Sequence, residues 1–123
     1  MKLLIVLAFV TVAAARPDSD YSRYENFNVD EITGNKRLLK AYCDCFLGVG
    51  KCTPEGSDFK TWIPESVQNS CGKCSENQKV LVSKMIIAIQ EQLPEDWVKL
   101  NKEYDPDSKY VEALKEFLHK YGH

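Results

Sequence analysis

The sequence predicts an all-α protein with a single domain of about six helices. Three observations lead to this prediction. Apolar side chains recur every three or four residues in several segments, as on one face of a helix. Glycine, proline and helix-capping residues separate these segments. No segment shows the sustained alternation of apolar and polar residues that is typical of a half-buried strand.

The first two predicted helices are separated by a short break. A short helix is expected over residues 29–33, and Gly34 and Asn35 interrupt it. The next helix is expected over residues 36–49, where apolar residues recur at helical spacing. Gly50 is expected to mark its end.

A turn and a third helix are expected next. Residues 51–56 contain the sequence Thr-Pro-Glu-Gly, which is typical of a turn. Ser57 or Asp58 can then cap the third helix. Pro64 lies inside this helix and is expected to kink it or to restart it, because proline lacks the backbone N–H that a helix interior uses.

The remaining helices have clear start signals. Ser75 and Gln78 match a capping box, and they open the most strongly apolar helix of the chain. Pro94 is followed by two acidic residues, which is a favourable helix start. A last helix is expected over residues 108–121.

Residues 1–15 match a signal peptide. Lys2 is followed by an apolar run over residues 3–12 and then by three alanines, after which we expect cleavage. The run is too short to span a bilayer, which needs about 20 residues. We therefore expect a secreted, extracellular domain over residues 16–123 with no membrane span. Its acidic and basic residues are interspersed, with a net charge of −2 for the whole chain, so no nucleic-acid partner is expected.

Four cysteines have a distinctive spacing, with two neighbouring pairs. Cys45 and Cys52 have six residues between them, and Cys71 and Cys74 form a C-x-x-C sequence. Four cysteines allow three disulfide pairings, although each neighbouring pair is local and lies at a helix end. A redox-active C-x-x-C and a four-cysteine zinc site are alternatives. Both are disfavoured in an exported chain without a thioredoxin-like strand–helix pattern.

A fifth cysteine, Cys43, is left over. It cannot bond to Cys45 within a helix, because residues two apart point in different directions. A half-buried free thiol is the first interpretation. A disulfide-linked dimer through Cys43 is the alternative, in a protein otherwise expected to be mostly monomeric.

Catalysis is not expected. The two histidines, His119 and His123, both lie at the C-terminal end of the chain. The sequence has no zinc-protease, phosphate-loop or nucleophile-elbow motif. We therefore expect no catalytic residues, no metal and no cofactor.

Several motifs together resemble the arthropod chemosensory proteins, which are small secreted four-cysteine carriers. The cysteine spacing C-x6-C-x18-C-x2-C matches that family at every interval. Flanking residues agree as well: Asp30-Glu31-Ile32, Arg37-Leu38-Leu39, residues 50–56, residues 74–78, Trp97, and Lys-Glu-Tyr-Asp-Pro over residues 102–106. The extra Cys43, Thr33 in place of an aliphatic residue, and Trp62 with Pro64 depart from the family pattern.

The resemblance implies six helices around an apolar channel, with disulfides between neighbouring cysteines. It implies a carrier of small long-chain hydrophobic molecules, such as fatty acyl derivatives, semiochemicals, odorants or pheromones. The residues expected by position to line the channel are Ile32, Leu39, Tyr42, Phe46, Phe59, Ile63, Val67, Val82, Ile86, Ile89 and Trp97.

Apolar stripes at helical spacing, taken alone, indicate a plain core more often than a ligand cavity. The alternative function is therefore a secreted helical interaction protein or developmental factor with no small-molecule ligand. Such a protein would expose an apolar strip, for which Trp62, Tyr110 and Tyr121 are the candidates.

Overall fold

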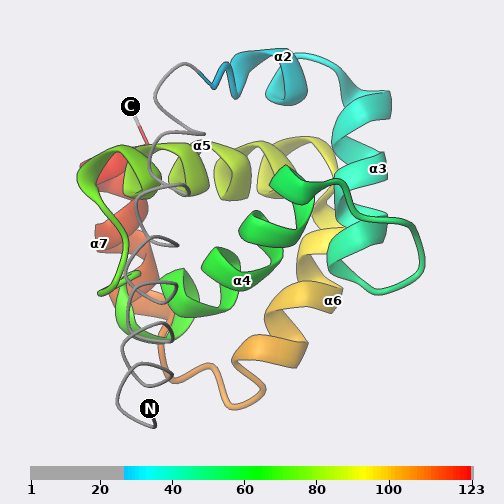
Figure 1. Cartoon of the computed structure of the whole chain (residues 1–123). Coiled ribbons are helices and arrows are strands. Elements are labelled where there is room, and N and C mark those ends of the chain that lie inside the picture. Colours follow the sequence, from blue (N-terminus) through cyan, green and yellow to red (C-terminus); the bar gives the residue numbers. More distant parts are fainter. Residues whose placement is uncertain (1–26, 123) are drawn as a thin grey trace, which may run out of the picture.

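The computed structural model describes residues 27–122 and has an all-α fold, as predicted (Figure 1). No strand occurs in this range. Residues 1–26, which include the expected signal peptide, and residue 123 lie outside the described residues. The helices are α2 (Asp30–Thr33), α3 (Lys36–Phe46), α4 (Pro54–Asn69), α5 (Glu76–Gln92), α6 (Pro94–Tyr104) and α7 (Val111–Tyr121).

The helices α4 and α5 form the centre of the domain. Helix α5 contacts every other helix of the described chain, and α4 contacts α3, α5, α6 and α7. The other helices surround this pair, with α3 and α6 toward one end and α7 toward the other (Figure 1). The apolar faces of all the helices can therefore meet in one core.

Two of the predicted helix starts are confirmed in detail. The Ser75 side chain accepts a hydrogen bond from the Gln78 N–H at 3.1 Å, and the Gln78 side chain accepts one from the Ser75 N–H at 2.8 Å. This reciprocal pair is the capping box, which satisfies donors that a helix start leaves free. Helix α6 begins at Pro94, with Glu95 and Asp96 in its first turn.

The predicted start of the third helix is wrong. Thr53, rather than Ser57 or Asp58, is the N-cap of α4, and its hydroxyl accepts a hydrogen bond from the Gly56 N–H at 2.9 Å. Pro54 occupies the first helical position, where a missing N–H is harmless. Residues 54–56, the second half of the expected turn, therefore form the first turn of the helix.

Pro64 does not restart the helix. A single element, α4, runs from Pro54 to Asn69 with Pro64 inside it. Proline removes one backbone hydrogen bond, but packing of an amphipathic face supplies most of a helix's stability in proteins. Phe59, Ile63 and Val67 are buried on either side of the proline, so the core contacts of α4 continue across it.

Two other predicted boundaries move inward by a few residues. Helix α3 ends at Phe46 rather than at residue 49, because the N–H groups of Val49 and Gly50 both turn back to the carbonyl of Asp44. Helix α7 begins at Val111 rather than at residue 108. The Asp105 carboxylate there accepts hydrogen bonds from the backbone N–H groups of residues 109 and 110, which hold a non-helical turn.

The disulfides join neighbouring cysteines, as expected from the resemblance. Cys45 bonds to Cys52, with 5.0 Å between their Cα atoms, and Cys71 bonds to Cys74, with 5.3 Å. The first pair fastens the end of α3 to the loop before α4, and the second lies between α4 and α5. Both cross-links close short loops beside the core. Among the described residues, no helix is both long and apolar enough to cross a bilayer.

Candidate functional site

The residues expected to line a channel lie together in the interior of the domain. Nine of the eleven are buried members of one apolar cluster: Ile32, Leu39, Phe46, Phe59, Ile63, Val67, Val82, Ile86 and Ile89. The other two, Tyr42 and Trp97, are partly buried and pack against this cluster. The structure therefore brings all eleven predicted residues to the same core.

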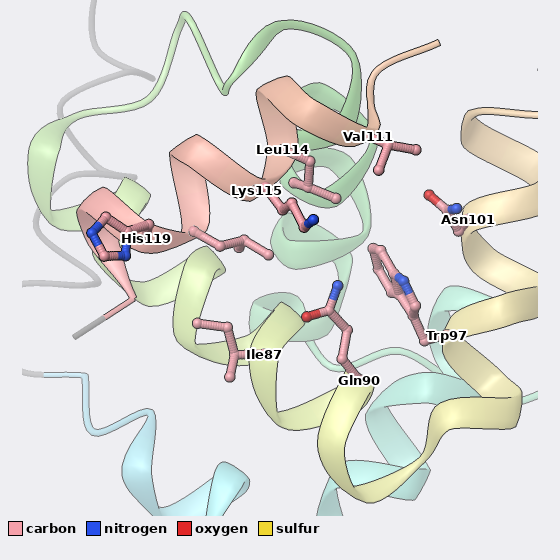
Figure 2. A pocket seen from close by; sticks show the side chains of 9 residues that line it. Ile87, Gln90, Trp97, Asn101, Val111, Leu114, Lys115 and His119 are labelled. Atoms are coloured by element: carbon pink, nitrogen blue, oxygen red, sulfur yellow. The ribbon is translucent and has the colours of Figure 1, made fainter. Parts of the chain in front are cut away.

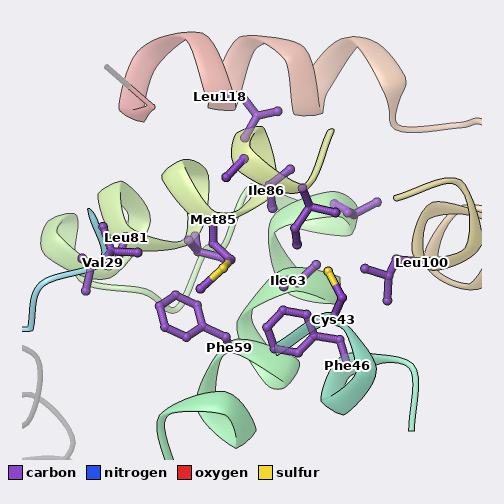
Figure 3. Packing of buried hydrophobic residues seen from close by; sticks show 14 of the residues in the cluster. Val29, Cys43, Phe46, Phe59, Ile63, Leu81, Met85, Ile86, Leu100 and Leu118 are labelled. Atoms are coloured by element: carbon purple, nitrogen blue, oxygen red, sulfur yellow. The ribbon is translucent and has the colours of Figure 1, made fainter. Parts of the chain in front are cut away.

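Figure 3 shows how this core is assembled from different helices. The rings of Phe46 and Phe59 lie on either side of Ile63, and Met85 and Ile86 of α5 lie above them. Leu118 of α7 covers the core from the far side of α5. Met85 is completely buried, and its flexible thioether can adapt to a changed neighbour more readily than a branched side chain can.

A hollow of about 420 Å³ opens at the surface beside this core. We call it the α5–α6–α7 cleft, because its walls come from those helices (Figure 2). Its volume falls within the usual range for small-molecule sites, roughly 300–1,000 Å³. It is lined by Ile87, Gln90, Trp97, Asn101, Val111, Leu114, Lys115, Leu118 and His119.

The floor of the cleft is continuous with the core. Leu114 and Leu118 line the cleft and are also buried members of the apolar cluster. Trp97 is the one residue that belongs both to the predicted channel set and to the cleft lining. The cleft is thus an opening at which the outer side of the core meets solvent.

Sequence reasoning missed the polar residues of this cleft. Gln90, Asn101 and Lys115 lie on three different helices and match no motif. In Figure 2 the amide of Gln90 and the amine of Lys115 both point into the space beside the Trp97 indole. The available signal was weak: Lys115 directly follows the apolar Leu114 on an amphipathic helix.

Trp97 follows a residue that is fixed by an ion pair. The Asp96 carboxylate is almost buried, and its Oδ2 accepts a hydrogen bond from Lys40 Nζ at 2.9 Å. Lys40 Nζ also lies 3.2 Å from Asp44 Oδ1. These hydrogen bonds, the one to Asp96 foremost, raise the pKa of Lys40 above its ordinary value of 10.5. Helix α3 thereby holds the first turn of α6, which carries Trp97 into the cleft.

The extra cysteine is fully buried. Cys43 has 0% of its surface exposed, forms no disulfide and belongs to the core cluster. Burial, and then the negative charge of Asp96, raise the pKa of its thiol to about 12. The folded chain therefore presents no thiol at position 43 for the intermolecular disulfide considered above.

The described residues give no support to the alternative zinc site. The group with metal-ligand spacing is Glu65, Cys71 and Cys74. Because the two sulfur atoms are bonded to each other, they offer no thiolate to zinc. Four of the five cysteines form the two disulfides, and Cys43 stays a free thiol.

The apolar strip expected of an interaction protein is also missing from the described surface. Trp62, Tyr110 and Tyr121 are each partly buried and pack against the core. Trp62 makes an edge-on contact with Phe59, with 5.1 Å between ring centroids. The large apolar side chains that are exposed lie on three different helices and one loop: Leu38, Val49, Val98 and Val111.

The sequence and the structure both match known proteins. Residues 21–112 match the model of the insect pheromone-binding family A10/OS-D. The ejaculatory bulb-specific protein 3 of Drosophila melanogaster is 42% identical over 112 residues, which cover 91% of this chain and 87% of that protein. A match to a binding family agrees with the expectation that the chain is not an enzyme.

Two solved structures are similar in fold. The antennal chemosensory protein A6 from the moth Mamestra brassicae is 36% identical, with a TM-score of 0.67, covering 81% of this chain and 93% of that one. A chemosensory protein in complex with bromo-dodecanol is 37% identical, with a TM-score of 0.65, covering 76% of this chain and 94% of that one.

Proposed function

Because this chain belongs to the insect pheromone-binding family A10/OS-D, we propose that it is a secreted carrier of small long-chain hydrophobic molecules. Fatty acyl derivatives, semiochemicals, odorants and pheromones are the ligand classes that fit this proposal. Residues 1–15 would direct export as a signal peptide, and residues 16–123 would form the carrier domain. The ligand would lie in the apolar interior between the helices.

The observation that carries this proposal is the position of Trp97. This side chain packs against the buried core and also lines the α5–α6–α7 cleft. An alkyl chain entering the cleft would meet Trp97, Leu114 and Leu118, and would continue inward along the apolar side chains of the core cluster. A solved relative holds bromo-dodecanol, which is a long-chain alcohol.

The eleven predicted lining residues would form the inner wall of the site. They are closely packed together, so a ligand would have to displace some of them as it enters. Met85 is suited to this adjustment, because it has several rotatable bonds and sits among these residues. Burial of each ligand methylene contributes about 0.8 kcal/mol, so affinity should change gradually with chain length.

The two tryptophans provide a direct test. Trp62→Phe leaves Trp97 as the single tryptophan, and Trp97→Phe leaves Trp62. Titration with 1-dodecanol should change the fluorescence emission of the Trp62→Phe variant more than that of the Trp97→Phe variant. Equilibrium dialysis of the unmodified protein measures retention independently of fluorescence. The carrier proposal fails if Trp97 emission is unchanged and dialysis shows no retention, and the interaction-protein alternative would then lead.

A further inference from the structure

The described rim of the α5–α6–α7 cleft carries one formal charge, which is positive. Among the described residues that line the cleft, Lys115 is the cation and none is an aspartate or glutamate. Gln90 and Asn101 add amide groups. A site with this rim favours anions over cations, because the ammonium group of Lys115 is the formal charge among the described residues that line it.

Lys115 differs from the three lysines of the described structure that form ion pairs. Lys40, Lys79 and Lys84 each lie within 4.0 Å of a carboxylate oxygen. Lys115 has no such partner among the described residues, and its amine points into the cleft beside the Gln90 amide (Figure 2). Its charge is therefore available to a ligand.

The cleft combines this charge with an apolar floor. Val111, Leu114 and Leu118 contribute apolar side chains from α7, and Trp97 contributes an aromatic face from α6. A small inorganic anion would use the amine but leave the apolar surface uncovered. A neutral alkyl chain would cover the apolar surface but leave the amine without a partner. A molecule with a long alkyl chain and a terminal carboxylate uses both.

We propose that Lys115 makes this carrier prefer long-chain carboxylates over neutral molecules of the same chain length. The carboxylate would lie at the cleft mouth near Lys115 Nζ and within reach of the Gln90 amide, with the alkyl chain directed past Trp97 toward the core. This inference rests on the proposed carrier function and names the head group that the same site selects.

The expected preference is modest. Lys115 is exposed, and ion pairs at exposed positions are weakened by solvent and by salt. Measured energies of such pairs correspond to a change in affinity of roughly two- to fivefold. Screening should also weaken the binding of the carboxylate as the salt concentration rises, so the preference should shrink. The affinity for a neutral alcohol should not fall with salt, because that ligand carries no charge.

The experiment compares dodecanoate with 1-dodecanol by isothermal titration calorimetry, below the concentrations at which either aggregates. Lys115→Met removes the charge and keeps a flexible apolar side chain of similar reach. Lys99→Met is the matched control, because Lys99 is exposed on α6 and does not line the cleft. Lys115→Arg restores the charge and should restore the preference. Circular dichroism checks that each variant is folded.

We expect the ratio of dodecanoate affinity to dodecanol affinity to fall roughly two- to fivefold in Lys115→Met. The ratio should stay unchanged in Lys99→Met and Lys115→Arg. An unchanged ratio in Lys115→Met, with both ligands still bound, overturns the inference and leaves the carrier function standing. If the unmodified protein binds neither ligand, both proposals are overturned.

Discussion

Lys40 and Asp96 connect two helices through a hydrogen bond of 2.9 Å between Nζ and Oδ2, although the two residues are 56 positions apart in the sequence. Asp96 is 5% exposed, so its carboxylate has little contact with water and depends on this partner. The pair joins α3 to the start of α6, directly before Trp97. Removal of either partner should therefore lower the stability of the fold and also disturb the position of Trp97 in the cleft.

Lys40→Met should lower the free energy of unfolding by about 1 kcal/mol, because it leaves Asp96 without its charged donor, while the exposure of Lys40 limits the loss. Urea unfolding measures this change. Lys36→Met is the control, since Lys36 is exposed on the same helix and forms no ion pair in the described structure. The pKa of Lys40 is raised by folding, so its contribution is present below pH 10.5 and lost as the pH rises through the higher folded value. If Lys40→Met and Lys36→Met lower the free energy of unfolding equally, the ion pair between Lys40 and Asp96 does not stabilise the fold.

Two buried serines should respond in opposite directions to the same substitution. The Ser83 hydroxyl is buried and has no hydrogen-bond partner among the described residues, whereas the Ser66 hydroxyl donates to the Trp62 carbonyl at 2.8 Å. Ser83→Ala removes an unsatisfied polar group and should raise the free energy of unfolding by about 1 kcal/mol. Ser66→Ala breaks a hydrogen bond and should lower it by about 1 kcal/mol. Thermal unfolding of both variants tests this. An equal loss of stability in the two variants would show that the Ser83 hydroxyl forms a hydrogen bond in solution.

The Cys43 thiol should be inert in the folded protein. Its pKa is raised to about 12, so almost no reactive thiolate exists near neutral pH, and the sulfur is shielded by the core. A thiol-modifying reagent should label no cysteine in the native protein and one after unfolding without a reductant. Electrophoresis without reductant should show a monomer. Rapid native labelling or a covalent dimer would show that position 43 becomes exposed.

Reduction of the two disulfides should loosen the domain without removing its helices. Their partners are separated by 7 and 3 residues, so each closes a short loop and contributes about 2 kcal/mol in the loop-entropy model. Most of the stability should come from the shared core. Circular dichroism should therefore keep its helical signal after reduction at room temperature, while the midpoint of thermal unfolding falls. Complete loss of the signal would mean that the cross-links are essential to the fold.

The features that depend on local chemistry or on helical spacing could be predicted from the sequence. The start of α5 was predictable because the Ser75–Gln78 capping box needs only four consecutive residues. The start of α4 was not, because Thr53 followed by proline and glycine fits both a turn and a capped helix. The eleven lining residues were expected from the resemblance to the chemosensory proteins, and they pack together in one core because they lie on the apolar stripes of their helices. The cleft could not be predicted in this way, because Lys115 and Gln90 come to line the same cleft only through the packing of α5 against α7.

Ile86 is the residue on which the stability of the core and the shape of the proposed site should both depend. It is fully buried on α5, among the aromatic and aliphatic side chains of α3 and α4. Ile86→Ala should lower the free energy of unfolding by about 2–4 kcal/mol, because it removes buried methyl groups and leaves a cavity. The same cavity should favour bulkier ligands, so the affinity for a branched long-chain alcohol should rise relative to that for 1-dodecanol.

Leu114→Ala on α7 is the matched control for Ile86→Ala. Leu114 is also buried, but it lies at the floor of the cleft rather than at the centre of the core. Truncation there should weaken binding of both alcohols alike, because it removes apolar contact near the entrance without enlarging the interior. Urea unfolding and competitive binding of the two alcohols measure these effects. If Ile86→Ala loses stability but leaves the relative affinities unchanged, the ligand does not reach the interior beside Ile86, and binding is confined to the cleft.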